Sequence, residues 1–360
     1  MQINPQTSAR IYNLSFFATL AVMFMHLPDA GVVPGRLYSF FDSFTVLAVP
    51  TFFLLSGFLL GRSASEPGWY ARALKKRATS LVVPYFVLNT LMIPFLVLHQ
   101  NILKAGNWAP GGVQFDWYSI SRIYGLTFRY TPVVGALWYV RCLLFFILLS
   151  PLLIRPLRRT RTSAVLVLTL VFAGVAALEG AHLGDPWGYL FYYFFNLRGF
   201  CFFTLGLSCA FWAPAAWPAA WRPYTLGVCA AAGLSLWLLA PACRSALPLW
   251  LVMLAAIWLA TPSRPLPRFL TASSFALFGL HQLVYHAHAA GIRLFKFQEL
   301  FTASPLVLTP LVASLVLILP FAQFARTKAP RLDRLLFGGR CGGKRGTQDS
   351  GLRTAAAQQS

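Results

Sequence analysis

The chain has 360 residues, of which 58% are hydrophobic and only 11% are charged. Soluble globular proteins contain about 45–50% apolar and about 25% charged residues, so this chain has too few polar side chains to cover a water-soluble particle. The composition therefore excludes a disordered chain, a coiled coil and an ordinary cytosolic enzyme, and it predicts an all-α polytopic membrane protein. The net charge of +21 comes from short basic runs between apolar segments, a pattern typical of loops at an anionic membrane surface, so no nucleic-acid partner is expected.

Ten segments are long and apolar enough to form transmembrane helices, each of which needs about 17–25 predominantly apolar residues. Pro241, Arg244 and Pro248 interrupt the seventh and eighth segments, so the ends of these two are the hardest to place. In chain order the segments are 11–27, 44–61, 79–98, 133–154, 163–180, 188–211, 224–240, 246–260, 270–290 and 305–325.

The basic residues orient these helices, because cytoplasmic loops carry an excess of lysine and arginine. One set of alternate connecting segments, which includes both ends of the chain, holds 21 basic residues, and the other set holds seven. The rule therefore predicts that both termini are cytoplasmic, with membrane lipids around the helices.

Two segments outside the predicted helices differ from the others. Residues 338–360 are rich in glycine, basic residues and glutamine, so they are expected to form a disordered cytoplasmic tail after a membrane domain of residues 1–337. Residues 99–132 form the only long outer loop, whose aromatic side chains indicate either an interfacial belt or part of an acceptor cleft. These side chains are Trp108, Phe115, Trp117, Tyr118, Tyr124 and Tyr130.

Among the ionisable residues inside predicted helices, four qualify as candidate site residues, namely His26, Arg141, Arg198 and His281. Inserting each of them costs about 2.5–3.5 kcal/mol, so each needs a partner or a function. His26 lies toward the outer half of the first helix, where a neutral imidazole could act as a general base. Asp29, three residues later on the same face, could orient its ring. The alternative is a histidine whose hydrogen bonds are satisfied by a neighbouring helix.

The arginines and the late histidines also have alternative interpretations. Arg141 lies near the outer end of its helix and either reaches the membrane surface or meets a polar cavity. Arg198 is deeper, which favours a buried structural or functional role. His281 and His288 share a helix face, but His286 points elsewhere and no carboxylate joins them, so no metal site is expected.

A basic cluster precedes the third predicted helix and comprises Arg72, Lys75, Lys76 and Arg77. Part of its role is to fix the topology by contact with lipid phosphates. The same cations could also form a phosphate-binding rim for a soluble anionic donor such as a coenzyme A ester. Charge alone does not separate these two interpretations.

Several short motifs follow one another along nearly the whole chain. They are Asn13-Leu14 with His26, the run from Val49 to Leu59, Lys76-Arg77 with Val83-Pro84-Tyr85, Leu137-Trp138-Tyr139 with Ser150-Pro151-Leu152-Leu153, and the run from Ser274 to His281. Together they resemble the acyltransferase type 3 family of bacterial integral-membrane O-acyltransferases, and especially its stand-alone members that acetylate surface glycans.

The resemblance implies a cytoplasmic acyl-CoA donor, with acetyl-CoA expected, and an acceptor hydroxyl on a cell-surface glycan, glycolipid or related molecule. It implies that His26 is the catalytic base and that His281 takes part in a role that the resemblance does not specify. It also associates Arg72, Lys75, Lys76 and Arg77 with function. The implied location is the bacterial inner membrane, with acyl-CoA as a co-substrate and no permanently bound cofactor.

One position departs from the family pattern. The family places an arginine eleven residues before the histidine of the first helix, and this chain has Ser15 there. Eleven residues bring two positions to within about 20° of each other around a helix, whereas Arg10 is about 160° away from His26 and cannot replace that arginine. Either Arg141 or Arg198 supplies the cation, or Ser15 accommodates a different acyl donor, or activity is lost.

Two other classes of function stay open on the sequence. A transporter or flippase for an amphipathic substrate also needs polar residues inside a bundle, although no internal repeat is visible between the two halves. A catalytically silent relative that binds acyl-CoA or lipid is the other alternative, and Ser15 is the reason to consider it.

Overall fold

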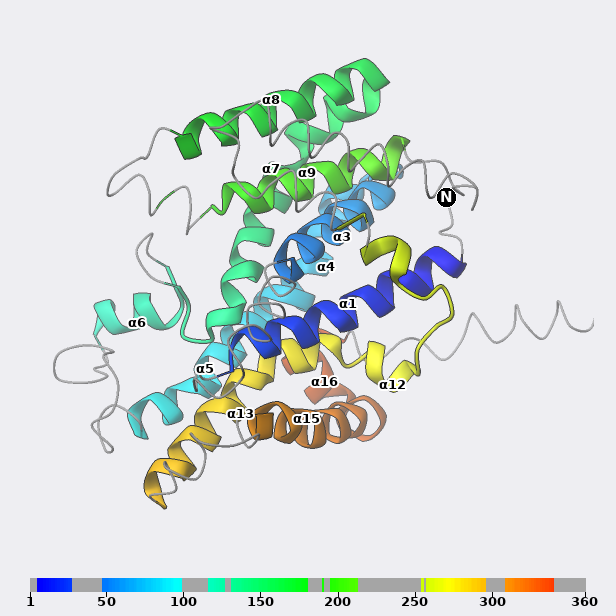
Figure 1. Cartoon of the computed structure of the whole chain (residues 1–360). Coiled ribbons are helices and arrows are strands. Elements are labelled where there is room, and N and C mark those ends of the chain that lie inside the picture. The colour runs from blue at the N-terminus through cyan, green and yellow to red at the C-terminus, as the bar shows by residue number, and fades with distance from the viewer. Residues whose placement is uncertain are drawn as a thin grey trace, which may run out of the picture.

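The computed structural model describes residues 5–27, 47–98, 116–126, 131–180, 190, 195–212, 254–255, 257–295 and 308–339. Across these ranges the chain is helical and has no β-strand. Figure 1 shows α1 (Pro5–Met25) running beside α13 (Ser274–Leu294). The other elements are α3 (Ala48–Ser63), α4 (Trp69–Arg77), η1 (Ala78–Val82), α5 (Val83–Val97), α6 (Trp117–Ile123), η3 (Gly135–Leu137), α7 (Trp138–Arg159), α8 (Arg161–Gly180), α9 (Leu197–Trp212), α12 (Arg268–Thr271), α15 (Thr309–Lys328) and α16 (Pro330–Phe337).

Helices occupy eight of the ten segments that the sequence predicts to span the membrane. The segment 224–240 lies outside the described residues, as does most of 246–260. The number of spans and the side of the termini therefore stay predictions. Among the described residues, four helical stretches are long and apolar enough to cross a membrane, namely Pro5–Met25, Trp69–Val97, Gly135–Arg159 and Thr309–Lys328.

The third and sixth predicted helices show the largest differences between the predicted and the observed first residue. The third begins at Trp69 rather than at residue 79, because the basic α4 continues through η1 into α5. α9 begins at Leu197 rather than at residue 188. Asn196 has a φ of 46° and accepts a hydrogen bond from the Gly199 N–H at 2.7 Å, which caps the start of this helix.

The closest helix crossing joins α3 to α9 through glycines. A Cβ on Gly57 would overlap the carbonyl oxygen of Phe203, and one on Gly206 would overlap that of Leu54. Small residues let two backbones approach closely in a membrane, where apolar side chains gain little by leaving lipid. The glycines at these two positions therefore set the distance between α3 and α9.

Aromatic rings and a hydroxyl pair join α3 to α7. The ring of Phe53 lies 4.7 Å from that of Tyr139 and 5.1 Å from that of Phe146, centroid to centroid. The Tyr139 hydroxyl is 2.8 Å from the Ser56 hydroxyl and donates to the Phe52 carbonyl at 3.2 Å. This buried polar contact is satisfied at both ends, as a low-dielectric interior requires.

Prolines shape two of the long helices. Pro151 has no N–H for the carbonyl of Ile147, and the Ser150 hydroxyl donates to that carbonyl instead, at 2.7 Å. Pro84 likewise has no N–H to donate to the carbonyl of Ser80. The backbone before Pro84 forms the π-helical turn η1. Gly338, whose φ of 65° ends α16, lies directly against the Ser80 backbone, so α16 packs on this turn.

The short helix α6 lies in the predicted outer loop and is capped by a carboxylate. Asp116 accepts a hydrogen bond from the Ser119 N–H at 2.7 Å. This bond lowers the pKa of Asp116, so the cap stabilises α6 above the ordinary pKa of aspartate and is lost as the pH falls through the lowered one. Trp117 is exposed, and the Tyr124 hydroxyl is 2.8 Å from that of Thr90. Trp108, Phe115 and Tyr130 lie outside the described residues.

One asparagine anchors the first helix. The buried Asn13 side chain donates to the carbonyls of Pro262 and Arg264, at 3.0 and 2.8 Å, and accepts from the Leu266 N–H at 3.1 Å. These three bonds use most of the capacity of its amide group. They hold α1 against the segment that leads into α13, and α13 carries the second histidine.

Candidate active site

The structure brings His26 and His281 together. Their ring centroids are 5.2 Å apart, and the ring planes meet edge to face at 62°. His26 lies in the turn that follows α1, while His281 lies within α13 and is fully buried. The two residues are remote in sequence, so the packing of α1 on α13 creates the pair.

Hydrogen bonds to the backbone assign the tautomer of each ring. His26 Nδ1 is 2.8 Å from the carbonyl oxygen of Val22. His281 Nδ1 is 3.1 Å from the carbonyl oxygen of Leu277 and 2.9 Å from that of Phe278. Because carbonyl oxygens only accept, Nδ1 carries the proton in both neutral rings, and each Nε2 bears a lone pair.

The Nε2 atom of His281 has no hydrogen-bond partner within the part of the chain that the structure describes, although it is fully buried. A buried polar atom without a partner is costly, and such atoms are concentrated where chemistry or binding needs them. The His26 and His281 rings thus form a pair in which each Nε2 can accept a proton, and that of His281 is buried.

A tyrosine completes the group. Tyr285 donates its hydroxyl to the carbonyl of Met23 at 2.9 Å, and its ring lies edge-on to His281 with centroids 5.4 Å apart. The sequence interpretation missed this residue. The available signal was its position, because a residue four places after His281 lies on the same face of the helix.

Ser15, where the resemblance led us to expect an arginine, directs its side chain to its own helix. Its hydroxyl donates to the Ile11 carbonyl at 2.8 Å. The guanidinium of Arg10 lies 5.9 Å from the centroid of the Trp258 ring. The face of α1 that leads to His26 therefore carries a neutral hydroxyl at position 15, and this hydroxyl already donates its hydrogen bond within the helix.

Arg141 and Arg198 are both half-buried and lie on other elements, and the remaining candidates are not part of the histidine pair. Arg141 of α7 donates to the Gly125 carbonyl at 2.7 Å, which ties the turn after α6 to α7. Arg198 is half-buried at the second position of α9. Asp29 lies outside the described residues. His286 is exposed, and His288 Nε2 is 3.0 Å from the Thr309 hydroxyl.

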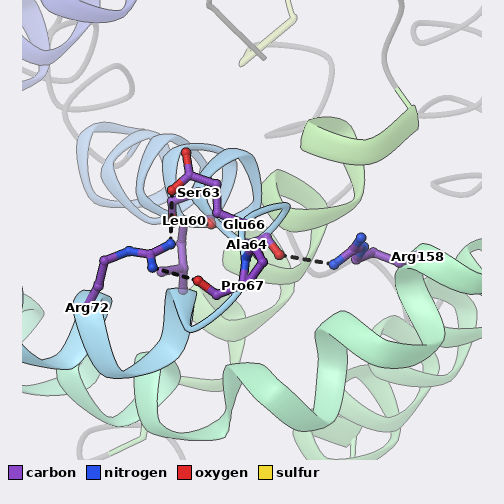
Figure 2. A network of polar contacts seen from close by, with 7 residues as sticks. All are labelled: Leu60, Ser63, Ala64, Glu66, Pro67, Arg72 and Arg158. Carbon is purple, nitrogen blue, oxygen red and sulfur yellow. Dashed lines mark hydrogen bonds and ion pairs between the residues drawn. The ribbon is translucent and has the colours of Figure 1, made fainter.

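The basic cluster divides into engaged and exposed cations. Figure 2 shows Arg72 and Arg158 reaching the loop after α3 from different helices. Arg72 pairs with the Glu66 carboxylate at 2.9 Å and donates to the Pro67 carbonyl at 2.6 Å, and Arg158 donates to the Ala64 carbonyl at 3.0 Å.

The other members of the cluster differ in exposure. Lys75 and Lys76 are exposed, whereas Arg77 is half-buried. Exposed lysines are compact, strongly hydrated cations that suit phosphate contacts. Arg72 is exposed as well, but it is paired with the Glu66 carboxylate, so Lys75 and Lys76 present the most accessible charge of the four predicted donor-binding residues.

The arrangement provides a proton acceptor inside a membrane domain, with exposed cations on another part of the same chain. A family model described as an acyltransferase domain matches residues 13–323. No curated protein and no solved structure matches the chain. Because the matched region takes in His26, His281 and most of the helices, the chain belongs to the acyltransferase type 3 family and is a membrane acyltransferase.

Proposed function

We propose that the protein transfers an acyl group, most simply acetyl, from cytoplasmic acyl-CoA to a hydroxyl of a cell-surface glycan, glycolipid or related acceptor in the bacterial inner membrane. The observation that carries the proposal is the His26–His281 pair, with His26 Nδ1 held by the Val22 carbonyl. That hydrogen bond leaves Nε2 as the proton acceptor, which is what a general base for an acceptor hydroxyl requires.

In this reaction the acceptor hydroxyl gives its proton to Nε2 of His26 as its oxygen bonds to the thioester carbonyl carbon. The carbon–sulfur bond then breaks, and the proton leaves with the coenzyme A thiolate as the free thiol. His281 limits the orientations of the His26 ring through the edge contact and offers the second Nε2 lone pair. Lys75 and Lys76 would attract the donor phosphates.

The test measures acetyl-CoA consumption by the full chain in lipid nanodiscs that contain a bacterial glycolipid extract, with coenzyme A quantified by chromatography. His26→Ala should lower turnover by about 100-fold or more, the usual contribution of a general base. The matched control is His286→Ala, which removes an exposed histidine of α13 and should turn over like the parent.

Each other outcome has a distinct meaning. Unchanged turnover in His26→Ala would overturn the proposed base. If the parent protein consumes no thioester but acetyl-CoA raises its melting temperature, the chain is a silent acyl-CoA-binding relative. If acetyl-CoA neither reacts nor stabilises the protein, the transporter interpretation replaces the proposal.

A further inference from the structure

One backbone carbonyl at the end of α1 accepts two hydrogen bonds. The oxygen of Met23 receives the main-chain N–H of His26 at 3.2 Å and the hydroxyl of Tyr285 at 2.9 Å. A carbonyl oxygen has two lone pairs, so both are in use. The preceding carbonyl, that of Val22, holds the His26 ring through Nδ1. The main chain and the ring of His26 thus both depend on this last turn.

The last turn of a helix is its least constrained part. Its carbonyls lack partners further along the helix, and 3₁₀-type hydrogen bonds, from the N–H of residue i+3 to the carbonyl of residue i, often tighten it. Here the N–H groups of His26 and Leu27 make such bonds, to Met23 and Phe24. The Tyr285 hydroxyl bond is different because it comes from another helix and joins this turn to α13.

Tyr285 also contacts the other histidine. Its ring lies at 82° to that of His281 with centroids 5.4 Å apart, and its side chain is buried. The same residue therefore touches His281 with its ring and fixes the turn that carries His26 with its hydroxyl. Figure 1 shows that these two anchor points belong to neighbouring helices, α1 and α13.

We infer that Tyr285 is a positioning residue, which sets the separation and orientation of the His26 and His281 rings through its bond to the Met23 carbonyl. The inference rests on the proposed function, because it concerns the geometry of the proposed base. A displacement of about 1 Å in a reacting group can reduce a rate by about 100-fold. One hydroxyl bond at the end of α1 is therefore sufficient to control turnover.

The experiment uses Tyr285→Phe in the full-length protein in nanodiscs, since this change keeps the ring and removes only the hydroxyl. With acetyl-CoA, kcat should fall about tenfold while KM for acetyl-CoA stays within about twofold, as expected for a misplaced reacting group. Without substrate, diethylpyrocarbonate should modify His26 several-fold faster, as measured by mass spectrometry, because the freed turn exposes Nε2.

The matched control is Tyr85→Phe. Tyr85 is another buried tyrosine whose hydroxyl donates to a carbonyl, that of Tyr124 at 2.6 Å. This variant loses an equivalent hydrogen bond, and the labelling rate of His26 should stay at the parent value. Equal acceleration in both variants would show a general loosening of the fold and would overturn the inference, as would parent-like kcat and labelling in Tyr285→Phe.

Failure of the inference can be told from failure of the proposed function. An active His26→Ala variant refutes the proposed base, and the positioning inference falls with it, whatever the labelling shows. If His26→Ala is inactive while Tyr285→Phe behaves like the parent in turnover and labelling, only the inference on Tyr285 fails.

Discussion

The cations before α5 illustrate how neighbouring residues of one charge can differ in role. All three of Arg72, Lys75 and Lys76 are exposed, but the Arg72 guanidinium is already bound to Glu66 and Pro67. A cation that must first break an ion pair gains less from a new anion. Sequence grouped these residues because they are close in the chain, but only the structure separates their partners.

We therefore predict that replacing both Lys75 and Lys76 by glutamine raises KM for acetyl-CoA several-fold, with kcat within about twofold. Under the proposed function the lysines attract the donor and do not touch the reacting bond, so their loss weakens donor binding and leaves the chemical step intact. The effect should shrink as salt is raised, because the Debye length is about 8 Å at physiological ionic strength. Steady-state kinetics at two salt concentrations measures both quantities.

Arg72→Gln serves as the comparison for each lysine changed singly to glutamine, since it also removes one positive charge from the same helix. We expect a smaller rise in KM together with a lower melting temperature, because the loop after α3 loses two contacts. A KM rise in Arg72→Gln that equals or exceeds the rise in either single lysine variant would contradict this division of the cluster.

At the scale of the helices, packing between remote segments is the feature that sequence could not supply. Apolar length located most of the helices, since it is a local property. The approach of Gly57 to Phe203 joins segments remote in the chain, and a glycine in a membrane helix has several uses. For the same reason His26 and His281 were identified one by one, but their contact required the fold.

The different surroundings of two glycines, one at the α3–α9 crossing and one in α8, predict different effects of the same substitution on stability. Gly57→Ala should lower the melting temperature, because its methyl would overlap the Phe203 carbonyl, and overpacking costs about 1–3 kcal/mol. Gly174→Ala in α8 should leave stability unchanged or raise it by up to about 1 kcal/mol, since nothing lies within 4 Å of the added Cβ and alanine favours helix.

Thermal unfolding of the two variants in the same detergent measures this difference. The comparison holds the chemical change constant and varies only the surroundings of the added methyl group. If Gly57→Ala is as stable as Gly174→Ala, the two backbones do not approach as closely as the structure shows.

At the scale of the whole molecule, contacts bring together segments that the basic residues assign to the same side of the membrane, and which side that is stays a prediction. Arg158 reaches Ala64, and Asn13 reaches Arg264, so segments assigned to the cytoplasmic side lie together. Arg141 likewise reaches Gly125 on the predicted outer side. The charge rule and the packing are independent sources of information, because the rule uses only composition of the connecting segments.

This sidedness predicts the reactivity of two introduced cysteines. Ser65 lies in the loop after α3 and Thr131 precedes η3, and both are exposed. In a parent whose native cysteines are replaced by alanine, a membrane-impermeant maleimide should label Ser65→Cys only in inside-out vesicles. It should label Thr131→Cys only in intact spheroplasts, because an odd number of spans separates the two positions. Labelling of both positions from the same side would require a different number of spans between them. If both positions are outside, Lys75 and Lys76 lie away from a cytoplasmic donor. If both are inside, the predicted acceptor loop lies on the same side as these lysines.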